Sequence, residues 1–372
     1  MIYFDNSATT YPKPQSVIQA TAMALDTCAN PGRGTHPLSM NAALELFECR
    51  KATAEMFGAS PERVIFTPGA TYALNMAIHA ASSVEGAILI SDLEHNAVLR
   101  PALASGREVR VFSSALGFEG EERTAAILAS VNRLAEDAAL LVVTAASNIC
   151  GAVMPISELG AYCRERGILF IVDGAQAGGI YDINVERDNI DVLCLPSHKG
   201  LYGPMGCGMM ILGEGVSLPT FVHGGSGVDS RSHTMPEYPP ERYEAGTLPV
   251  PVIVGLRRGI EFVKRRTVER IYANESRLAR LLSDSLINMG ARVYAPHLDG
   301  GIVLFNVDGF SSEELAAKLA KMGICVRAGL HCAPLAHDTL GSDGAVRASF
   351  SVWNTEAEVH QFCGALCKIK RR

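Results

Sequence analysis

The residues best suited to chemistry are a lysine and an aspartate that each follow a buried, apolar run. Lys199 stands in Ser197-His-Lys-Gly200, just after the run 192–195, and Asp173 follows the run 168–172. Open α/β sheets bind ligands at the carboxyl ends of their strands, and burial there lowers the pKa of a lysine so that its neutral amine can form a Schiff base. A Schiff-base lysine with an aspartate on a pyridinium nitrogen is typical of sites for pyridoxal phosphate (PLP).

Two further segments could complete such a site. Thr67-Pro-Gly-Ala-Thr71 lies between a predicted strand and a predicted helix, where bare backbone N–H groups and a hydroxyl form a phosphate cradle. In Glu94-His95-Asn96, the imidazole could lie flat on a pyridine ring. Each feature alone has an ordinary interpretation: a plain turn for residues 67–71, a structural His95, a solvated Lys199 and an Asp173 that caps a turn.

The elements that would position these residues alternate between strands and helices. The predicted helices are about 71–81, 96–104, 121–134 and 159–166. The predicted strands, short β-rich or continuous apolar runs, are 64–67, 87–90, 109–112, 139–144, 168–172, 192–195 and 207–212. This alternation predicts an α/β domain with a mostly parallel sheet.

The pattern changes after residue 212. Residues 213–251 are rich in Gly, Pro and Ser and predict a long functional loop. A long helical stretch follows over about 252–289, bent or broken near Thr267. Strands at 301–307, 324–326 and 346–350 and capping boxes at Ser311-x-x-Glu314 and Thr355-x-x-Glu358 then predict an α+β region.

Composition excludes several classes of protein. The chain has 372 residues, 48% of them hydrophobic, and a net charge of −6, which argues against disorder and against a nucleic-acid binder that needs a basic face. No apolar run reaches the length of a membrane span, and the first residues do not resemble a signal peptide. The ten cysteines form no C-x-x-C pair, so we expect no metal site and a reducing, cytoplasmic location.

Eight short segments together resemble one family. They are Tyr3-Phe-Asp-Asn-Ser-Ala-Thr-Thr10, Glu94-His-Asn96, Ser147-Asn148, Asp173-Gly-Ala-Gln176, His198-Lys199, Tyr202-Gly-Pro204, Glu244-Ala-Gly-Thr247 and Arg327-Ala-Gly-Leu-His-Cys332. In this order they resemble class V aminotransferase-fold enzymes, and the chain is similar to cysteine desulfurases and selenocysteine lyases from residue 3 to about 365. The Arg-x-Gly-x-His-Cys loop resembles the branch that includes the Suf-type desulfurases.

The resemblance implies a PLP-dependent transferase of fold type I. Residues 12–255 would form the large PLP-binding domain, and residues 1–11 and 256–372 a smaller α+β domain that carries the nucleophile loop. The expected activity is conversion of L-cysteine to L-alanine with a persulfide on Cys332, followed by transfer to an acceptor protein. The expected assembly is a homodimer.

The resemblance also assigns roles to single residues. Lys199 would be the Schiff-base lysine and proton shuttle, and Cys332 the sulfur acceptor. The other cofactor ligands would be Asp173 on the pyridinium nitrogen, Gln176 on the phenolic oxygen, His95 stacked on the ring, Gly69, Ala70, Thr71 and His198 at the phosphate, and Gly246 and Thr247 reaching the phosphate of the other subunit. Asn148, Arg347 and Arg327 would bind the substrate, the first two at its carboxylate, and His95 would also be a catalytic residue.

Three positions depart from the family pattern. Ala70 and Pro196 stand where phosphate-binding hydroxyls are common, and Leu330 replaces the first histidine of a common His-His-Cys. Cys332 lies beside His331 and five residues after Arg327, and positive neighbours lower the pKa of a thiol.

Three other functions remain open at this point. Selenocysteine lyase is the nearest alternative, and an epimerase or aminotransferase would not need the thiol. A non-catalytic sulfur carrier would not need Lys199, Asp173 or His95. A structural salt bridge is the alternative role of Arg347.

Overall fold

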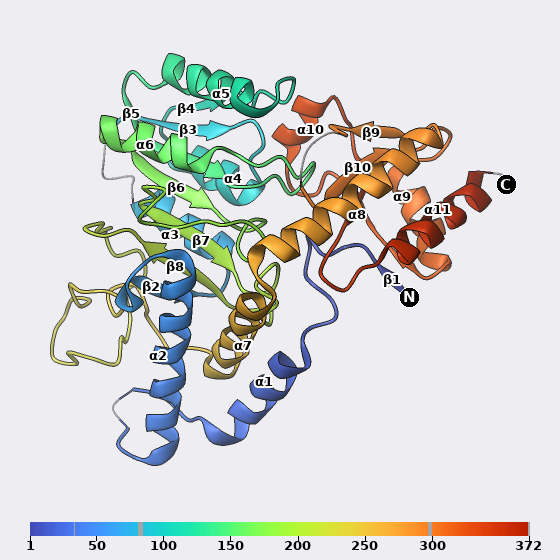
Figure 1. Cartoon of the computed structure of the whole chain (residues 1–372). Helices are drawn as coiled ribbons and strands as arrows, with labels where there is room; N and C mark the ends of the chain where they lie inside the picture. Colours follow the sequence, from blue (N-terminus) through green and yellow to red (C-terminus); the bar gives the residue numbers. More distant parts are fainter. Residues whose placement is uncertain (33, 81–84, 297–299, 371–372) are drawn as a thin grey trace.

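A seven-stranded sheet forms the centre of the larger lobe of the molecule (Figure 1). The computed structural model describes residues 1–32, 34–80, 85–296 and 300–370. The strand order is β2 (Val64–Thr67), β8 (Gly208–Leu212), β7 (Val192–Pro196), β6 (Leu169–Asp173), β5 (Ala138–Thr144), β3 (Ala87–Ser91) and β4 (Val109–Phe112). Strand β8 runs antiparallel to both of its neighbours, and the other pairs are parallel. The predicted mostly parallel sheet is therefore confirmed.

Both faces of this sheet are buried, because neighbouring residues of each strand enter different cores. In β5, for example, Leu141 and Val143 pack into one hydrophobic cluster and Leu140 and Val142 into the other. One face is covered by α3 (Ala70–Ala80) and α4 (Asn96–Ala104), the other by α2 (Pro37–Phe57), α5 (Gly120–Leu134), α6 (Ile156–Arg166) and α7 (Val250–Arg266). Strands buried on both faces read as continuous apolar runs, which is why the sequence indicated them.

The N-terminal helices border the larger lobe. Helix α1 (Gln15–Thr27) and α2 both pack on α7, and the short 3₁₀ helix η1 (Pro61–Arg63) leads into β2. Between β8 and α7 the described residues 213–249 contain no helix or strand, which agrees with the long loop predicted from their Gly-, Pro- and Ser-rich sequence. No helix among the described residues is long and apolar enough to cross a membrane.

A second, smaller lobe lies beyond α7 (Figure 1). Its antiparallel sheet has the order β12 (Arg327–Gly329), β13 (Ala345–Ser349), β10 (Ile302–Asn306) and β9 (Arg292–Tyr294). Its helices are α8 (Val268–Asn288), α9 (Ser312–Lys321), α10 (Pro334–Leu340) and α11 (Glu356–Lys370). Strand β1 (Ile2–Tyr3) pairs with β11 (Ile324–Cys325), so the N-terminus joins this lobe.

Several local predictions for the smaller lobe are confirmed. The long helical stretch breaks at Thr267, between α7 and α8. The Ser311 hydroxyl accepts the Glu314 amide at 3.1 Å, and the Thr355 hydroxyl accepts the Glu358 amide at 3.3 Å. The sequence did not indicate α1, α2, α10, β9 or β12, and residue 81, the predicted end of one helix, lies outside the described residues. The predicted domain boundary at residue 255 falls inside α7.

Candidate active site

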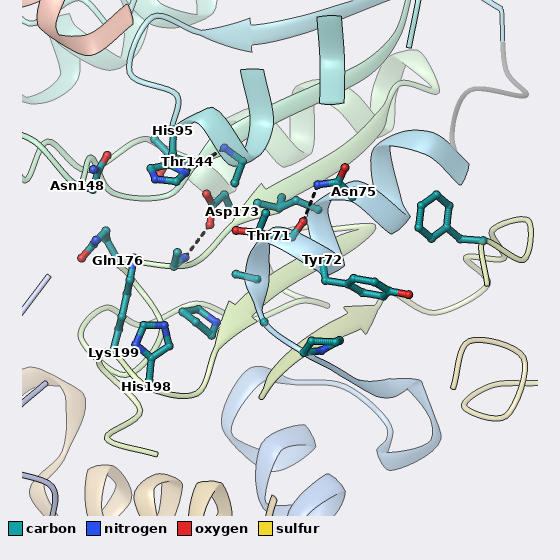
Figure 2. Close-up of a pocket in the computed structure, with 18 residues that line it drawn as sticks. Thr71, Tyr72, Asn75, His95, Thr144, Asn148, Asp173, Gln176, His198 and Lys199 are labelled. Carbon is teal, nitrogen blue, oxygen red and sulfur yellow. Dashed lines mark hydrogen bonds between the residues drawn. The ribbon is translucent and has the colours of Figure 1, made fainter. Parts of the chain in front are cut away.

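A cavity of about 550 Å³ lies at the carboxyl ends of β5, β6 and β7, between the first turns of α3 and α4 (Figure 2). This volume is typical of small-molecule sites. The predicted site residues that line it are Gly69, Ala70, Thr71, His95, Asn148, Asp173, Gln176, His198 and Lys199. The structure thus brings together nine of the predicted residues, from segments that are far apart in the sequence.

The lysine and the carboxylate of the predicted site lie in the same cavity. Burial lowers the pKa of Lys199 to about 8, and the nearby charge of Asp173 opposes this shift. Asp173 is buried at the end of β6, where its Oδ1 accepts the amide of Ala175 at 2.9 Å, and burial raises its pKa. A lysine with this pKa is largely a neutral amine at a mildly alkaline pH, and nucleophilic and proton-transfer roles require the neutral form.

His95 caps the start of α4 and faces the cavity (Figure 2). Its Nδ1 accepts the amide of Ala97 at 3.0 Å. Burial, with a contribution from the charge of Lys199, lowers the pKa of His95 to about 4. The imidazole is therefore neutral near pH 7, with its hydrogen on Nε2, and its orientation is fixed by the helix cap.

The opposite side of the cavity has the properties of an anion site. The first amides of α3 have no acceptor within the helix, and Thr71 adds a hydroxyl. A Cβ atom added at Gly69 would meet nothing within 4 Å, so there is open space above this turn. The buried Nδ1 of His198 has no hydrogen-bond partner among the described residues.

Ser197 does not replace the hydroxyl groups that are missing at Ala70 and Pro196, the two positions of this anion site that depart from the family pattern. Ala70 and Pro196 line the cavity without hydroxyls. Ser197 is fully buried and its hydroxyl donates to the carbonyl of Pro204, so it is directed away from the cavity. The anion would be held by backbone amides, Thr71 and His198.

The peptide that joins His198 to Lys199 is held by the N-terminal segment. The His198 carbonyl accepts four hydrogen bonds: from Lys13 Nζ at 2.7 Å, Thr9 Oγ1 at 3.0 Å, and the amide and hydroxyl of Thr10 at 3.1 and 3.2 Å. Sequence reasoning did not single out Lys13. Its only signal is its position three residues after the Thr9-Thr10 pair.

Cys332 lies beside the cavity rather than in its lining. The side chain is exposed, and its carbonyl accepts the amide of Asn96, next to His95, at 2.7 Å. The preceding carbonyl, that of His331, accepts Asn148 Nδ2 at 2.9 Å. Two hydrogen bonds therefore attach the cysteine loop to Asn148, which lines the cavity, and to Asn96, which lies between the lining residues His95 and Ala97.

The charges around Cys332 differ from the expectation. Burial lowers the pKa of His331 to about 3, so this imidazole is neutral, and the prediction that it adds positive charge is wrong. Arg327 is positive but forms a salt bridge with Asp5, with Nη2 and Oδ2 2.8 Å apart. The exposed loop can still present a thiol to a bound substrate.

Arg347 is buried on β13, opposite Arg327 in the sheet register, and does not line the cavity. Its Nη1 donates to the carbonyl of Asn148 at 2.8 Å, and its Nη2 to Asp5 Oδ1 at 3.3 Å. The Nε atom has no hydrogen-bond partner among the described residues. The predicted substrate arginine thus bonds to a cavity residue and retains one unused donor.

Gly246 and Thr247 lie apart from the other predicted cofactor residues. Both line a separate cavity of about 700 Å³ next to the buried Arg50–Glu244 salt bridge. Phe47 of α2 also lines this cavity, and further apolar side chains of α1 and α2 are exposed: Ile18, Met23, Leu25, Leu38, Met40 and Leu44. Within one subunit, Thr247 does not reach the Lys199 cavity.

Comparison with known proteins places the chain in a family. The model of the aminotransferase class-V family matches residues 2–362. A probable cysteine desulfurase from Pyrococcus abyssi is 32% identical over 381 aligned residues, covering 98% of this chain and 93% of the relative. A cysteine desulfurase from Haloferax volcanii is 30% identical, covering 98% and 88% of the two chains.

Solved structures show the same architecture. The apo structure of cysteine desulfurase from Thermococcus onnurineus NA1 superposes with a TM-score of 0.91 at 32% identity, covering 99% of this chain and 94% of that one. An Escherichia coli cysteine desulfurase in its S-sulfonic acid form, 24% identical, shares the fold with a TM-score of 0.86 over 98% and 94% of the chains. With a family match over nearly its whole length, this chain belongs to the aminotransferase class-V family.

Proposed function

We propose that the protein is a PLP-dependent cysteine desulfurase that converts L-cysteine to L-alanine and leaves a persulfide on Cys332. The observation that carries the proposal is the attachment of an exposed cysteine to the rim of a cavity that holds Lys199 and Asp173. Relatives named cysteine desulfurase, about 30% identical over the full chain, support the same activity.

The residues of the cavity fit PLP. When bound, this cofactor supplies an electron sink that stabilises negative charge on the substrate Cα. Asp173 would keep the ring nitrogen protonated, since a buried carboxylate favours a cationic partner. The remaining contacts would come from His95 over the ring, Gln176 at the phenolic oxygen, and Gly69, Ala70, Thr71 and His198 at the phosphate.

Different side chains of the protein would bind the substrate, transfer the proton and attack the sulfur. Arg347, through its unused Nε, and Asn148 would bind the substrate carboxylate. Lys199 would move the Cα proton, which its pKa of about 8 allows near neutral pH. The Cys332 thiolate would attack the substrate sulfur, so that the S–S bond forms as the Cβ–S bond breaks. The electron pair of the broken bond stays with the carbon fragment, which leaves as alanine after a proton has been added at Cβ and one returned to Cα.

Replacement of the nucleophile tests the activity. Cys332→Ala should abolish alanine release from cysteine but retain a measurable rate with selenocysteine, because selenium leaves carbon more readily than sulfur. Mass spectrometry after one turnover of the native protein should find the persulfide on Cys332. The matched control is Cys367→Ala, an exposed cysteine on α11, which should keep both rates.

The same assays separate the competing functions. A rate confined to selenocysteine in the native protein would assign a selenocysteine lyase. Wild-type turnover of cysteine by Cys332→Ala, with a persulfide only on another cysteine, would remove the nucleophile assignment. It would also reopen the aminotransferase and epimerase alternatives.

A second experiment tests the cofactor lysine. Borohydride should fix PLP on Lys199 of the native protein. Lys199→Ala should leave the protein colourless, or with PLP that washes off. The half-exposed Lys264, paired with Glu55 at 2.7 Å, serves as the control position. PLP fixed on any other lysine would contradict the assignment.

The working unit we propose is a homodimer in the cytoplasm that passes sulfur to an acceptor protein. The exposed apolar side chains of α1 and α2 include Phe47, which lines the cavity of Gly246 and Thr247, and exposed apolar side chains of this kind are typical of an interface. In a symmetric dimer the same face would carry Thr247 to the partner's site. All ten cysteines are free thiols, which suits a reducing compartment.

A further inference from the structure

A line of polar groups begins beside Cys332 and runs into the protein. His331 Nδ1 lies 3.3 Å from His337 Nε2, and His337 Nδ1 lies 3.1 Å from Ser342 Oγ. The two imidazole planes differ by only 9°, with ring centroids 5.5 Å apart, so the nitrogens meet nearly edge to edge. His337 is 1% exposed, and Ser342 is also buried. The reaction assigned to Cys332 makes no use of His337 or Ser342.

The Arg327 carbonyl at one end fixes the direction of the hydrogen bonds when both imidazoles are neutral. His331 Nε2 lies 3.4 Å from the carbonyl of Arg327, which can only accept, so Nε2 carries the hydrogen. In a neutral ring, Nδ1 of His331 then accepts from His337 Nε2–H, and His337 Nδ1 accepts from the Ser342 hydroxyl. Ser342 Oγ in turn accepts the Gly344 amide at 3.2 Å. Every group in the line is satisfied when both histidines are neutral, and burial lowers the pKa of both.

The backbone that this line supports is strained. His331 and Cys332 have φ angles of 52° and 57°, consecutive left-handed conformations that residues other than glycine avoid. Such a conformation persists only where the surroundings over-determine it. Asn96 and Asn148 hold the two carbonyls, and the His331 ring is held by the Arg327 carbonyl at Nε2 and by His337 at Nδ1. Of these two ring contacts, the one to His337 links the loop to helix α10.

We propose that His337 is a positioning residue: through its hydrogen bond to His331 it holds the left-handed backbone that keeps Cys332 against the rim of the Lys199 cavity. The inference rests on the proposed function, because it assigns a purpose to the position of Cys332.

The packing around His337 supports this role. The neighbouring Ala333 and Ala336 are fully buried in the core that also covers the central sheet. An apolar side chain would satisfy such a site without the cost of burying an imidazole. A buried imidazole at position 337 is explained if its hydrogen bond to His331 specifies one conformation of the loop that carries Cys332. Helix α10 is also fixed to the larger lobe by Thr339 Oγ1, which donates to the carbonyl of Asp92 at 3.4 Å.

Two substitutions of similar polarity separate positioning from packing. In His337→Gln the amide nitrogen can occupy the place of Nε2 and donate to His331. In His337→Asn the shorter amide reaches only the place of Nδ1, next to Ser342. Both variants bury an amide, so a role in packing alone predicts similar behaviour.

The readout is hydrogen exchange at the amide of Asn96. This amide is the first of α4 and has no acceptor within the helix, so its protection depends on the Cys332 carbonyl. We expect exchange about tenfold faster in His337→Asn and near the native rate in His337→Gln, because loosening the loop raises the open population. The rate constant kcat for cysteine should fall about tenfold in His337→Asn with KM within twofold.

A third variant and a control complete the design. Ser342→Ala removes the far end of the line and should also accelerate exchange at Asn96, which keeps the test valid if His337→Asn does not fold. His360→Asn, on the exposed face of α11, should change nothing. Two results would overturn the inference. One is an equal exchange rate at Asn96 in the native protein, His337→Gln and His337→Asn; the other is an equal rate in the two variants that differs from the native rate. Because exchange is measured without substrate, the test of the role of His337 gives a result whether or not the protein desulfurates cysteine.

Discussion

Arg347 and Asp5 are 342 positions apart in the sequence, yet Nη2 of the arginine lies 3.3 Å from Oδ1 of the aspartate. Asp5 also binds Arg327, so one carboxylate is shared by two guanidinium groups on neighbouring strands. This partial neutralisation leaves a net positive charge near Asn148. It also leaves a buried Nε on Arg347 that has no hydrogen-bond partner in the part of the chain that the structure describes. A buried donor without a partner is costly, and a substrate carboxylate would satisfy it.

We predict that Arg347→Lys raises the KM for cysteine at least about tenfold, a loss of about 1.4 kcal/mol, because an ammonium cannot reproduce the paired hydrogen bonds of a guanidinium. The PLP content, measured by absorbance, should stay at the native level. Arg133→Lys on the exposed face of α5 is the control. If the KM is unchanged while stability falls, Arg347 has only the role of a structural salt bridge.

Composite active sites predict complementation between inactive subunits. Lys199→Ala removes the lysine of a subunit's own cavity, and Thr247→Ala removes a hydroxyl that would serve the partner's site. A mixed dimer contains one site with both native residues. After random exchange of subunits, activity should recover to about a quarter of the native value, since half the dimers are mixed and each has one intact site.

The measurement is alanine release after the two variants are unfolded and refolded together, compared with each refolded alone. Two observations would each refute the composite site: no recovery beyond the sum of the separate variants, or full activity of the native protein as a monomer by light scattering.

Thr267 stores strain at the junction of α7 and α8. Its φ of 64° and ψ of 142° fall in a region that essentially only glycine occupies. Thr267→Gly should raise the free energy of unfolding by about 1 kcal/mol, because relief of about 1–3 kcal/mol of strain exceeds the extra chain entropy of glycine. Urea denaturation measures it. Thr267→Ala retains a Cβ and should bring no such gain; equal stabilisation by both variants would show that strain is not the cause.

The sequence was most informative where a local pattern has a single physical cause. The apolar runs of the central strands could be predicted because both sheet faces are buried. Helix α2 could not, because apolar side chains occupy both its buried and its exposed faces: Ala42 and Leu46 are buried, whereas Leu44 and Phe47 are exposed. A helix that is apolar on two sides lacks the periodicity that identifies amphipathic helices.

The contacts that organise the candidate site join distant parts of the chain. Neither the Asn96–Cys332 hydrogen bond nor the convergence of Lys13 on the His198 carbonyl follows from local periodicity. The sequence placed Lys199 and Asp173 at neighbouring strand ends because parallel strands share one edge. It could not show that the ring of His331 turns inward to His337, since this depends on packing of α10 against the sheet.

Glu94 carries the last prediction, a pH dependence of stability. The side chain is fully buried behind the cavity, and burial raises its pKa to about 8. Its Oε1 accepts the Ser91 hydroxyl at 2.5 Å and the Thr144 amide at 2.8 Å, and the charge of Asp173 adds to the shift. Between the unfolded pKa of 4.5 and about 8, the folded protein holds a proton that the unfolded chain releases. The contribution of Glu94 to stability is therefore complete below pH 4.5 and is lost as the pH rises towards 8.

Glu94→Gln keeps the acceptor oxygen and has no proton to lose. In the native protein each pH unit of this interval lowers the free energy of unfolding by at most about 1.4 kcal/mol, and the variant lacks this loss. From pH 5.5 to 8, the free energy of unfolding of the variant should therefore rise by about 2–3 kcal/mol relative to that of the native protein. Urea unfolding at the two pH values measures the difference, with Glu186→Gln, an exposed position, as the control. Parallel stability curves for the native protein and Glu94→Gln would mean that Glu94 is ionised in the fold. A second negative charge would then lie next to that of Asp173, and the assignment of Asp173 as the single anionic carboxylate at the cavity would have to be revised.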